Sequence, residues 1–218
     1  MSYCTNTASG PPRETMNGPV LLLCLLSYAL LGSLPFAFFR RGRFNLAWFM
    51  TAGPFLGDAA LIVAALAGAV SPLELPLAIS EALSYVAVAL VAAAIALIGC
   101  TLGVHRVPLS LWHQEDDTPA ALVTYGPYAR IRHPFYAAFI LLLIGTAAAL
   151  PHAGTLTLLI IGALQLQRTA RREERRLLVS RFGAEYASYM SRTGRFLPRV
   201  MPATRRPESD RTWVVTRQ

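Results

Sequence analysis

The sequence of 218 residues has no lysine and few charged side chains of any kind. Charged residues make up 15% of it and hydrophobic residues 54%, and its mean hydropathy is +0.44. A soluble globular domain usually carries about 25% charged residues. The scarcity of charge therefore excludes that class and predicts an integral membrane protein. The net charge of +8 comes entirely from arginine, which reflects genome composition as readily as function, so we infer no nucleic-acid partner from it.

Cysteine is also scarce, and the three cysteines lie far apart, at Cys4, Cys24 and Cys100. Their spacing matches no metal or redox motif, and we interpret them as small packing residues. A second set of possible ligands does not have the spacing of a zinc site either. That set consists of His105, His113, Glu115 and Asp116. We therefore predict no metal site.

Four apolar blocks indicate the fold class. They cover residues 20–39, 44–70, 77–103 and 134–167. Each of the first three fits one membrane helix, which needs about 20 residues to cross about 30 Å of hydrocarbon. The fourth is too long for one helix and is interrupted at "LPHAG" (150–154), which predicts a helical hairpin. The sequence thus predicts an all-α integral membrane fold with five transmembrane helices, the last two forming the hairpin, plus a cytoplasmic C-terminal helix.

The arginines predict the orientation of these helices. With five spans, nineteen of the 20 arginines fall on one side of the membrane, and short cytoplasmic segments are enriched in positive charge. We therefore expect a multi-pass cell-membrane protein with its N-terminus outside and its C-terminus in the cytoplasm. Residues 1–19 form a polar tail ahead of a retained first span, and residues 20–103 form three transmembrane helices. Residues 104–199 comprise the cytoplasmic loop, the hairpin and the C-terminal helix, and residues 200–218 form a disordered tail.

The stretch "GPYARIRHPFY" (126–136) places a polar cluster directly before the hairpin. Its Gly-Pro pair predicts a turn, and Pro134 suits the first position of a helix, because its missing N–H would be unpaired there. A helix start presents free N–H groups and a partial positive charge, which suit an anionic group such as a carboxylate. His133 and Tyr136 should share a face near that end. The alternative is a belt of Tyr, Arg and His that anchors the helix at the membrane interface.

A second polar cluster, "RREERRLLVSRFGAEYASYM" (171–190), follows the hairpin. Glu173 and Glu174 lie among arginines just past the last apolar residues, and Phe182-Gly183 should end or bend the helix. As structure alone, the acids would pair with arginines three or four residues away, each pair contributing about 0.2–0.5 kcal/mol. A tail that adheres to anionic lipid heads would explain the arginines. It would leave the acids, the tyrosines and the glycine unexplained.

Taken in order, these motifs resemble the isoprenylcysteine carboxyl methyltransferase family and its bacterial relatives. The order is Gly-Pro-Tyr, Arg-His-Pro-x-Tyr, an apolar hairpin, Glu-Glu-x-x-x-Leu, Phe-Gly, Tyr-x-x-Tyr and Arg-x-x-Pro, over residues from about 113 to 198. Each fragment is common, whereas the compound order is highly specific. The resemblance implies an integral membrane enzyme that uses S-adenosylmethionine (SAM) to methylate a lipophilic substrate. Residues 104–199 would form its methyltransferase core, with a cytoplasmic cofactor pocket that has an opening towards the lipid.

The resemblance also implies roles for individual residues. Those implied to contact the cofactor are Gln114, Leu122, Val123, Tyr128, His133, Pro134, Tyr136 and Glu174. The implied catalytic residues are Arg171, His133 and Arg132. A family arginine near the acceptor aligns with Ala170 here, and Arg171 or Arg168 would take its place. The sulfonium and ammonium of SAM suit a carboxylate such as Glu174, and its carboxylate suits a helix start or an arginine.

The sequence leaves open the identity of the methyl acceptor and two alternative classes of protein. Arginine- and alanine-rich usage without lysine suggests a high-GC bacterium, so a long-chain phenolic lipid, an alkylresorcinol or alkylpyrone, is expected first and a prenylcysteine carboxylate second. A phenol, with a pKa near about 10, needs help from His133 or an arginine to lose its proton, whereas a carboxylate arrives ionised. The other classes are an NADPH-dependent membrane reductase and a non-enzymatic lipid-binding scaffold. Asp58 in the second span either contacts substrate or hydrogen-bonds between helices.

Overall fold

The computed structural model describes residues 17–33, 39–40, 43–44, 46–104 and 122–199. The described chain is almost entirely helical, as predicted. Its helices are α1 (Asn17–Ser33), α2 (Leu46–Leu66), α3 (Leu77–Val104), η1 (Gly126–Ala129, a 3-10 helix), α4 (Pro134–Ala149), α5 (Ala153–Leu178) and α6 (Gly183–Arg192). Two strands that the sequence did not predict, β1 (Phe39–Arg40) and β2 (Arg43–Phe44), pair antiparallel.

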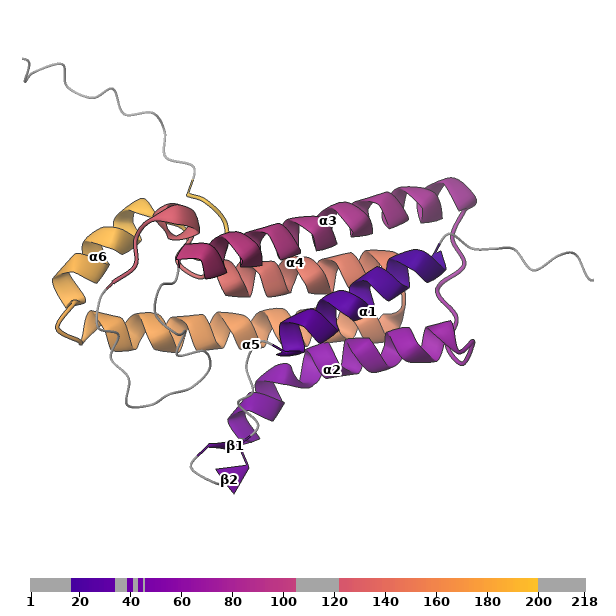
Figure 1. Cartoon of the computed structure of the whole chain (residues 1–218), viewed down its shortest axis with the longest axis horizontal. Coiled ribbons are helices and arrows are strands. Elements are labelled where there is room, and N and C mark those ends of the chain that lie inside the picture. Colours follow the sequence, from indigo (N-terminus) through magenta and orange to yellow (C-terminus); the bar gives the residue numbers. More distant parts are fainter. Residues whose placement is uncertain (1–16, 34–38, 41–42, 45, 105–121, 200–218) are drawn as a thin grey trace, which may run out of the picture.

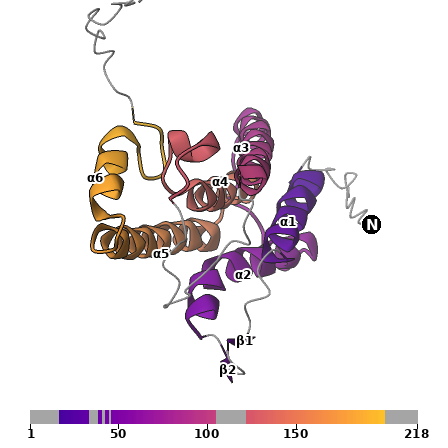
Figure 2. The ribbon, with the colours of Figure 1, turned by 60° about the vertical axis from the view of Figure 1, so that its left-hand side comes forward.

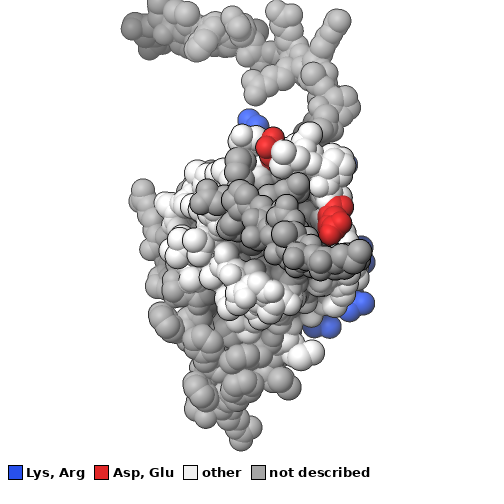
Figure 3. Space-filling model, turned by 90° about the vertical axis from the view of Figure 1, so that its right-hand side faces the viewer, with Lys and Arg blue, Asp and Glu red and all other residues white. Residues whose placement is uncertain are grey.

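The five long helices lie side by side, and the chain reverses direction at each connection (Figure 1). The end of α3, the start of α4 and the end of α5 therefore meet at one end of the bundle, where η1 and α6 also lie (Figure 1). Figure 2 shows α4 between α3 and α5, and α4 also contacts α1 and α2. From the opposite end, the described residues in view are mostly uncharged, with a few acidic and basic side chains among them (Figure 3).

Only α3 is long and apolar enough to cross a membrane by itself, among the residues that the structure describes. The stretches Gly18–Leu30, Met50–Leu66 and Pro134–Ala149 are apolar but shorter. The 16 residues of α4 cover about 24 Å at about 1.5 Å per residue, less than about 30 Å of hydrocarbon. Five membrane crossings therefore stay a prediction.

The hairpin predicted at residues 150–154 is present between α4 and α5. The side chain of His152 caps α5, because its Nδ1 accepts a hydrogen bond from the N–H of Gly154 at 3.0 Å. The hydroxyl of Thr155 closes the turn by donating to the carbonyl oxygen of Leu150 at 2.8 Å. These contacts satisfy backbone groups that a sharp turn between two apolar helices would otherwise leave unpaired.

Helix α5 extends beyond the predicted apolar block, which ends at residue 167. It continues to Leu178 without a break. Residues 167–178 are mostly arginine, glutamate, leucine and alanine, which favour helix, and the next glycine is Gly183. As predicted, the Phe182-Gly183 pair marks the boundary between two helices, α5 and α6. One helix thus has an apolar first half and a strongly charged second half.

A buried polar cluster joins three of the long helices. The hydroxyl of Tyr28 in α1 donates to Oδ2 of Asp58 in α2 at 2.9 Å and lies 2.9 Å from the hydroxyl oxygen of Thr146 in α4. Asp58 has no exposed surface. This arrangement favours the interpretation of Asp58 as a hydrogen-bonding link between helices over a substrate contact.

Candidate functional site

The segment before α4 pairs with the segment after α6 and so builds the frame of the site. Ile131 and Gly194 form a parallel bridge. The N–H of Arg132 donates to the carbonyl oxygen of Gly194 at 2.8 Å, and that of His133 donates to the carbonyl oxygen of Arg195 at 3.0 Å. A Cβ atom on Gly194 would lie 1.7 Å from the carbonyl oxygen of Leu197. Only glycine fits this close approach.

Glu174 is the centre of an ion cluster within this frame. The Nε of Arg132 donates to its Oε1 at 2.9 Å. From the other side, Arg195 donates through Nε to Oε1 at 3.0 Å and through Nη2 to Oε2 at 2.5 Å. Arg132 also donates to the carbonyl oxygens of Met190 and Thr193. The Glu174 side chain is only 4% exposed, so the carboxylate is enclosed by its two partners.

The surroundings keep Glu174 ionised. Burial by itself raises the pKa of this carboxyl group, but the close approach of His133, Arg195 and Arg132 outweighs it and holds the pKa far below its ordinary range. Nε2 of His133 lies 3.4 Å from Oε1 of Glu174. Because two guanidinium groups already neutralise this carboxylate, it is poorly placed to attract a further cation.

Glu173, the neighbouring acid, is much more accessible. Its side chain is 40% exposed. The hydroxyl of Tyr136 donates to its Oε1 at 2.6 Å, and Nδ1 of His133 lies 3.4 Å from its Oε2. The rings of His133 and Tyr136 stack, with centroids 5.3 Å apart and planes within 2°. The prediction that these two residues share a face near the start of α4 is therefore confirmed.

Two tyrosines connect η1 to α6 beside this site. The hydroxyl of Tyr189 donates to the carbonyl oxygen of Tyr128 at 2.6 Å. Burial raises the pKa of Tyr189 to about 12. Burial likewise raises the pKa of Tyr128 well above its ordinary value, with smaller contributions from Tyr189 and Glu173. Both phenols are therefore neutral at physiological pH, and neither supplies a base.

Most of the residues singled out in the sequence gather here. Arg132, His133, Pro134, Tyr136 and Glu174 lie together where the start of α4 faces the charged half of α5. Leu122 and Val123 lie half-buried in the segment before η1, and Gln114 falls outside the described residues. No functional role was predicted for Arg195 or Glu173 from the sequence. The signals that pointed to them were the Arg-x-x-Pro motif and the Glu-Glu pair.

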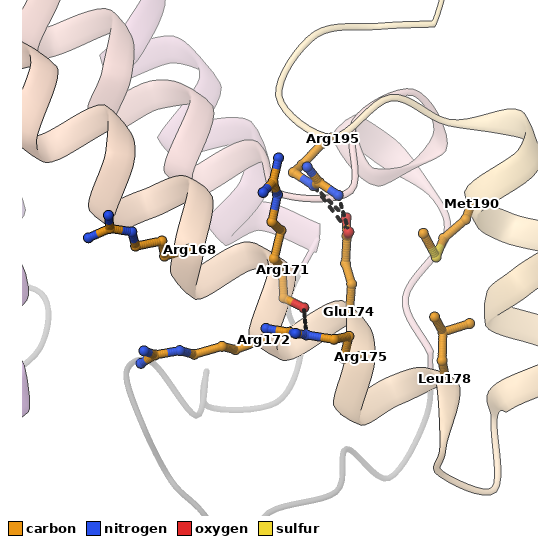
Figure 4. Close-up of a pocket in the computed structure, with 8 residues that line it drawn as sticks. All are labelled: Arg168, Arg171, Arg172, Glu174, Arg175, Leu178, Met190 and Arg195. Atoms are coloured by element: carbon orange, nitrogen blue, oxygen red, sulfur yellow. Dashed lines mark hydrogen bonds and ion pairs between the residues drawn. The ribbon is translucent and has the colours of Figure 1, made fainter.

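Arg171 is an exposed residue of α5. It lines a pocket of about 440 Å³ together with Arg168, Arg172, Glu174, Arg175, Leu178, Met190 and Arg195 (Figure 4). With its amide turned so that the oxygen faces the two guanidinium groups, Gln167 accepts from Arg195 Nη1 at 2.9 Å and from Arg171 Nη2 at 3.2 Å. Glu174 and Arg195 are thus common to this pocket and to the ion cluster.

The match to known proteins falls on this part of the chain. Residues 109–180 match the sequence model of the isoprenylcysteine carboxyl methyltransferase (ICMT) family, a family of membrane methyltransferases. The resemblance inferred from the motifs is therefore confirmed over this segment. The chain is also 36% identical over 94 residues to the cobalt-zinc-cadmium resistance protein CzcN of Cupriavidus metallidurans. That match covers 43% of this chain and 41% of the relative. No solved structure matches the chain.

Proposed function

We propose that the chain is a membrane methyltransferase that uses SAM to methylate an oxygen atom of a lipophilic acceptor. The observation that carries the proposal is the meeting of Glu173, His133 and Tyr136 beside the Glu174 cluster, within the segment that matches the methyltransferase family. Two motifs on either side of an apolar hairpin thereby contribute to one site. A structural interface belt alone does not require this meeting.

The side chains of the site fit the charges of SAM, with one change to the residue roles. SAM carries an ammonium, a sulfonium and a carboxylate. We assign the ammonium to Glu173, because this carboxylate is accessible and Glu174 is already paired with two arginines. Glu174 is then a positioning residue that holds Arg132 and Arg195. The stacked rings of His133 and Tyr136 offer an aromatic surface suited to a cation.

The remaining cofactor contacts keep their proposed residues. Leu122, Val123 and Tyr128 precede or form η1, on the chain segment that leads into His133 and Pro134. They would contact the less polar part of SAM, and Gln114 would contribute from the preceding loop. When bound, SAM supplies an electrophilic methyl group on sulfur. The protein's task is to align the acceptor oxygen with that group and to exclude water.

The role of the catalytic side chains depends on whether the acceptor is a phenol or a carboxylate. We propose a long-chain phenolic lipid, an alkylresorcinol or alkylpyrone, as the acceptor and a prenylcysteine carboxylate as the alternative. For a phenol, we assign removal of the proton to His133 or stabilisation of the phenolate to an arginine; Nδ1 and Nε2 of His133 lie 3.4 Å from oxygens of Glu173 and Glu174. For a carboxylate, Arg132 or Arg171 would orient the charged oxygen. Arg171 fits this second role less well, because it points into the arginine pocket.

The proposed membrane arrangement follows from the alternating helices. The site end of the bundle carries η1, α6 and the charged half of α5 (Figure 1). We place this end in the cytoplasm, the N-terminus outside, and the methyltransferase core in residues 104–199. All five long helices would cross the membrane, with α1 and α4 as short crossings. In a variant that lacks Cys4, cysteine substitution at Ala153, the first residue of α5, should give outside labelling by a membrane-impermeant thiol reagent.

Ligand binding separates the methyltransferase from its rivals. Calorimetry on the detergent-purified chain should show binding of SAM and S-adenosylhomocysteine but not of NADPH. Binding of NADPH alone would support the reductase, for which the arginines of α5 would hold the 2′-phosphate. Binding of none of them would support the lipid-binding scaffold. The name of the relative CzcN offers metal handling as a further possibility, but the described residues contain no group of three or more His, Cys, Asp or Glu that could hold a metal ion.

The product distinguishes the two proposed acceptors. The chain is incubated with SAM labelled in its methyl group and with either a long-chain alkylresorcinol or a farnesylated cysteine derivative. A methyl ester releases labelled methanol in mild alkali, whereas an aryl methyl ether does not. Alkali-stable label in the resorcinol lipid supports the phenolic acceptor. Alkali-labile label in the farnesylcysteine supports the carboxylate.

A further inference from the structure

Helix α5 presents one exposed stripe whose chemistry changes along its length. Positions 160, 164, 168, 171 and 175 are three or four residues apart and so lie on one face of the helix. Ile160 and Leu164 are 60% and 51% exposed, and the next three positions are the exposed Arg168, Arg171 and Arg175. The stripe is therefore apolar at its first two positions and cationic at the next three.

The cationic part of the stripe is a pocket rather than a flat patch. Five arginines and one glutamate line its volume of about 440 Å³. Figure 4 shows the side chains spread around the charged half of α5, with Met190 and Arg195 contributed by other parts of the chain. Arg175 donates from Nε to the carbonyl oxygen of Arg171 at 3.3 Å, and Arg195 is held by Glu174. Several guanidinium groups are thus anchored next to one another.

The pocket has an excess of positive charge. Among the described residues that line it, Glu174 is the only acid, and Arg132 and Arg195 already neutralise that carboxylate. Within the part of the chain that the structure describes, no carboxylate forms an ion pair with Arg168, Arg171, Arg172 or Arg175. Like charges held this close favour the binding of an anion between them. A phosphate group fits best, because guanidinium groups donate paired hydrogen bonds to phosphate oxygens.

We propose that this pocket binds the phosphate group of a membrane lipid whose hydrocarbon chain lies along Ile160 and Leu164. The apolar part of the stripe selects a lipid over a soluble phosphate, since it continues directly from the cationic part on the same face of α5. Arginines that directly follow an apolar helical segment also lie at the depth of lipid head groups. The pocket shares Glu174 and Arg195 with the ion cluster, but Glu173, His133 and Tyr136 do not line it, and lipid binding does not depend on methyl transfer.

Native mass spectrometry of the full chain in a non-ionic detergent tests the proposal. The probes are dioleoyl phosphatidate, dioleoyl phosphatidylcholine and glycerol 3-phosphate, which has the head group without the chains. The test variant is Arg172→Gln with Arg175→Gln, and the matched control is Arg176→Gln with Arg192→Gln, which removes the same charge from exposed positions outside the pocket. We expect the test variant to bind phosphatidate about tenfold or more weakly and the control to change less than about twofold.

Comparison of the three probes shows whether the pocket binds a lipid phosphate or a soluble phosphate, and how specific it is. Tighter binding of phosphatidate than of glycerol 3-phosphate and phosphatidylcholine supports the lipid site. Equal binding of glycerol 3-phosphate would mean a soluble phosphate and overturn the proposal, as would an equal loss in the control variant. All four substituted arginines are exposed, so the melting temperature should not change; Arg172→Lys with Arg175→Lys, which keeps the charge, should lose less affinity. SAM affinity, measured on the same variants, should be unaffected, which separates this site from the cofactor site.

Discussion

The N–H of His133 donates a hydrogen bond to the carbonyl oxygen of Arg195 at 3.0 Å. This bond uses one of the donors that the start of α4 was expected to offer to an anion, and Pro134 has no N–H to replace it. The anionic end of a cofactor is therefore better served by the guanidinium groups of Arg132 and Arg195 beside it. The sequence predicted that the backbone N–H groups at the start of α4 bind the carboxylate of the cofactor. The structure instead favours the side chains of these two arginines for that contact.

The two adjacent glutamates should respond differently to the same substitution. Glu173→Gln removes the accessible carboxylate, and we expect SAM affinity to fall about tenfold or more, because a charge-assisted hydrogen bond contributes about 1.5–3 kcal/mol. Glu174→Gln leaves the nearly buried Arg132 and the partly exposed Arg195 without their anion and should lower the free energy of unfolding by about 3 kcal/mol. Calorimetry with SAM and thermal denaturation in detergent measure the two effects.

Each variant is the control for the other. The Glu173→Gln protein should melt close to the wild type, since this side chain is 40% exposed. If Glu174→Gln abolishes SAM binding without lowering the melting temperature, Glu174 contacts the cofactor directly and the exchange of roles proposed here is wrong.

The depressed pKa of Glu174 makes a prediction about acid stability. A carboxyl group with a lower pKa in the folded state than in the unfolded state stabilises the fold above the unfolded pKa, which is near 4.5, and this contribution is lost as the pH falls towards the folded value. The difference in melting temperature between the wild type and Glu174→Gln should therefore be constant from about pH 7 to pH 5 and shrink below about pH 4.5. A difference that already shrinks between pH 7 and pH 5 would contradict the ion cluster.

Gly194 should tolerate no side chain. A Cβ atom there would lie 1.7 Å from the carbonyl oxygen of Leu197, and a backbone atom cannot move aside as a flexible side chain can. We expect Gly194→Ala to lower the free energy of unfolding by more than about 2 kcal/mol and to weaken SAM binding, because the bridge to Ile131 positions Arg132. Gly99→Ala in α3 is the matched control, since its Cβ would meet nothing within 4 Å. It should be neutral or stabilise by up to about 1 kcal/mol.

The sequence predicted the parts of this site that depend on local order. Pro134 marks the start of α4, the "LPHAG" turn separates α4 from α5, and the three-residue spacing places His133 over Tyr136. The interpretation of Glu174 failed to anticipate its two arginines, because these come from segments that are far apart in the sequence and pair with each other in the fold. Which of two adjacent acids faces inward depends on the rotation of α5, and α5 is longer than its apolar pattern suggested. The order of the motifs along the sequence does not define how α5 is rotated about its own axis.

Substitutions in the buried cluster around Asp58 test whether this residue links helices or contacts the lipophilic substrate. Tyr28→Phe removes the hydroxyl that joins Asp58 to Thr146, which should lower the free energy of unfolding by about 1–3 kcal/mol, because a buried acceptor loses its donor. Asp58→Asn keeps an oxygen that can accept from Tyr28 and should be milder. If Asp58 only links helices, both variants keep the SAM affinity and the acceptor KM of the wild type, as measured by calorimetry and by methyl-transfer kinetics. A raised acceptor KM in Asp58→Asn without a change in melting temperature would instead place Asp58 in the path of the lipophilic substrate.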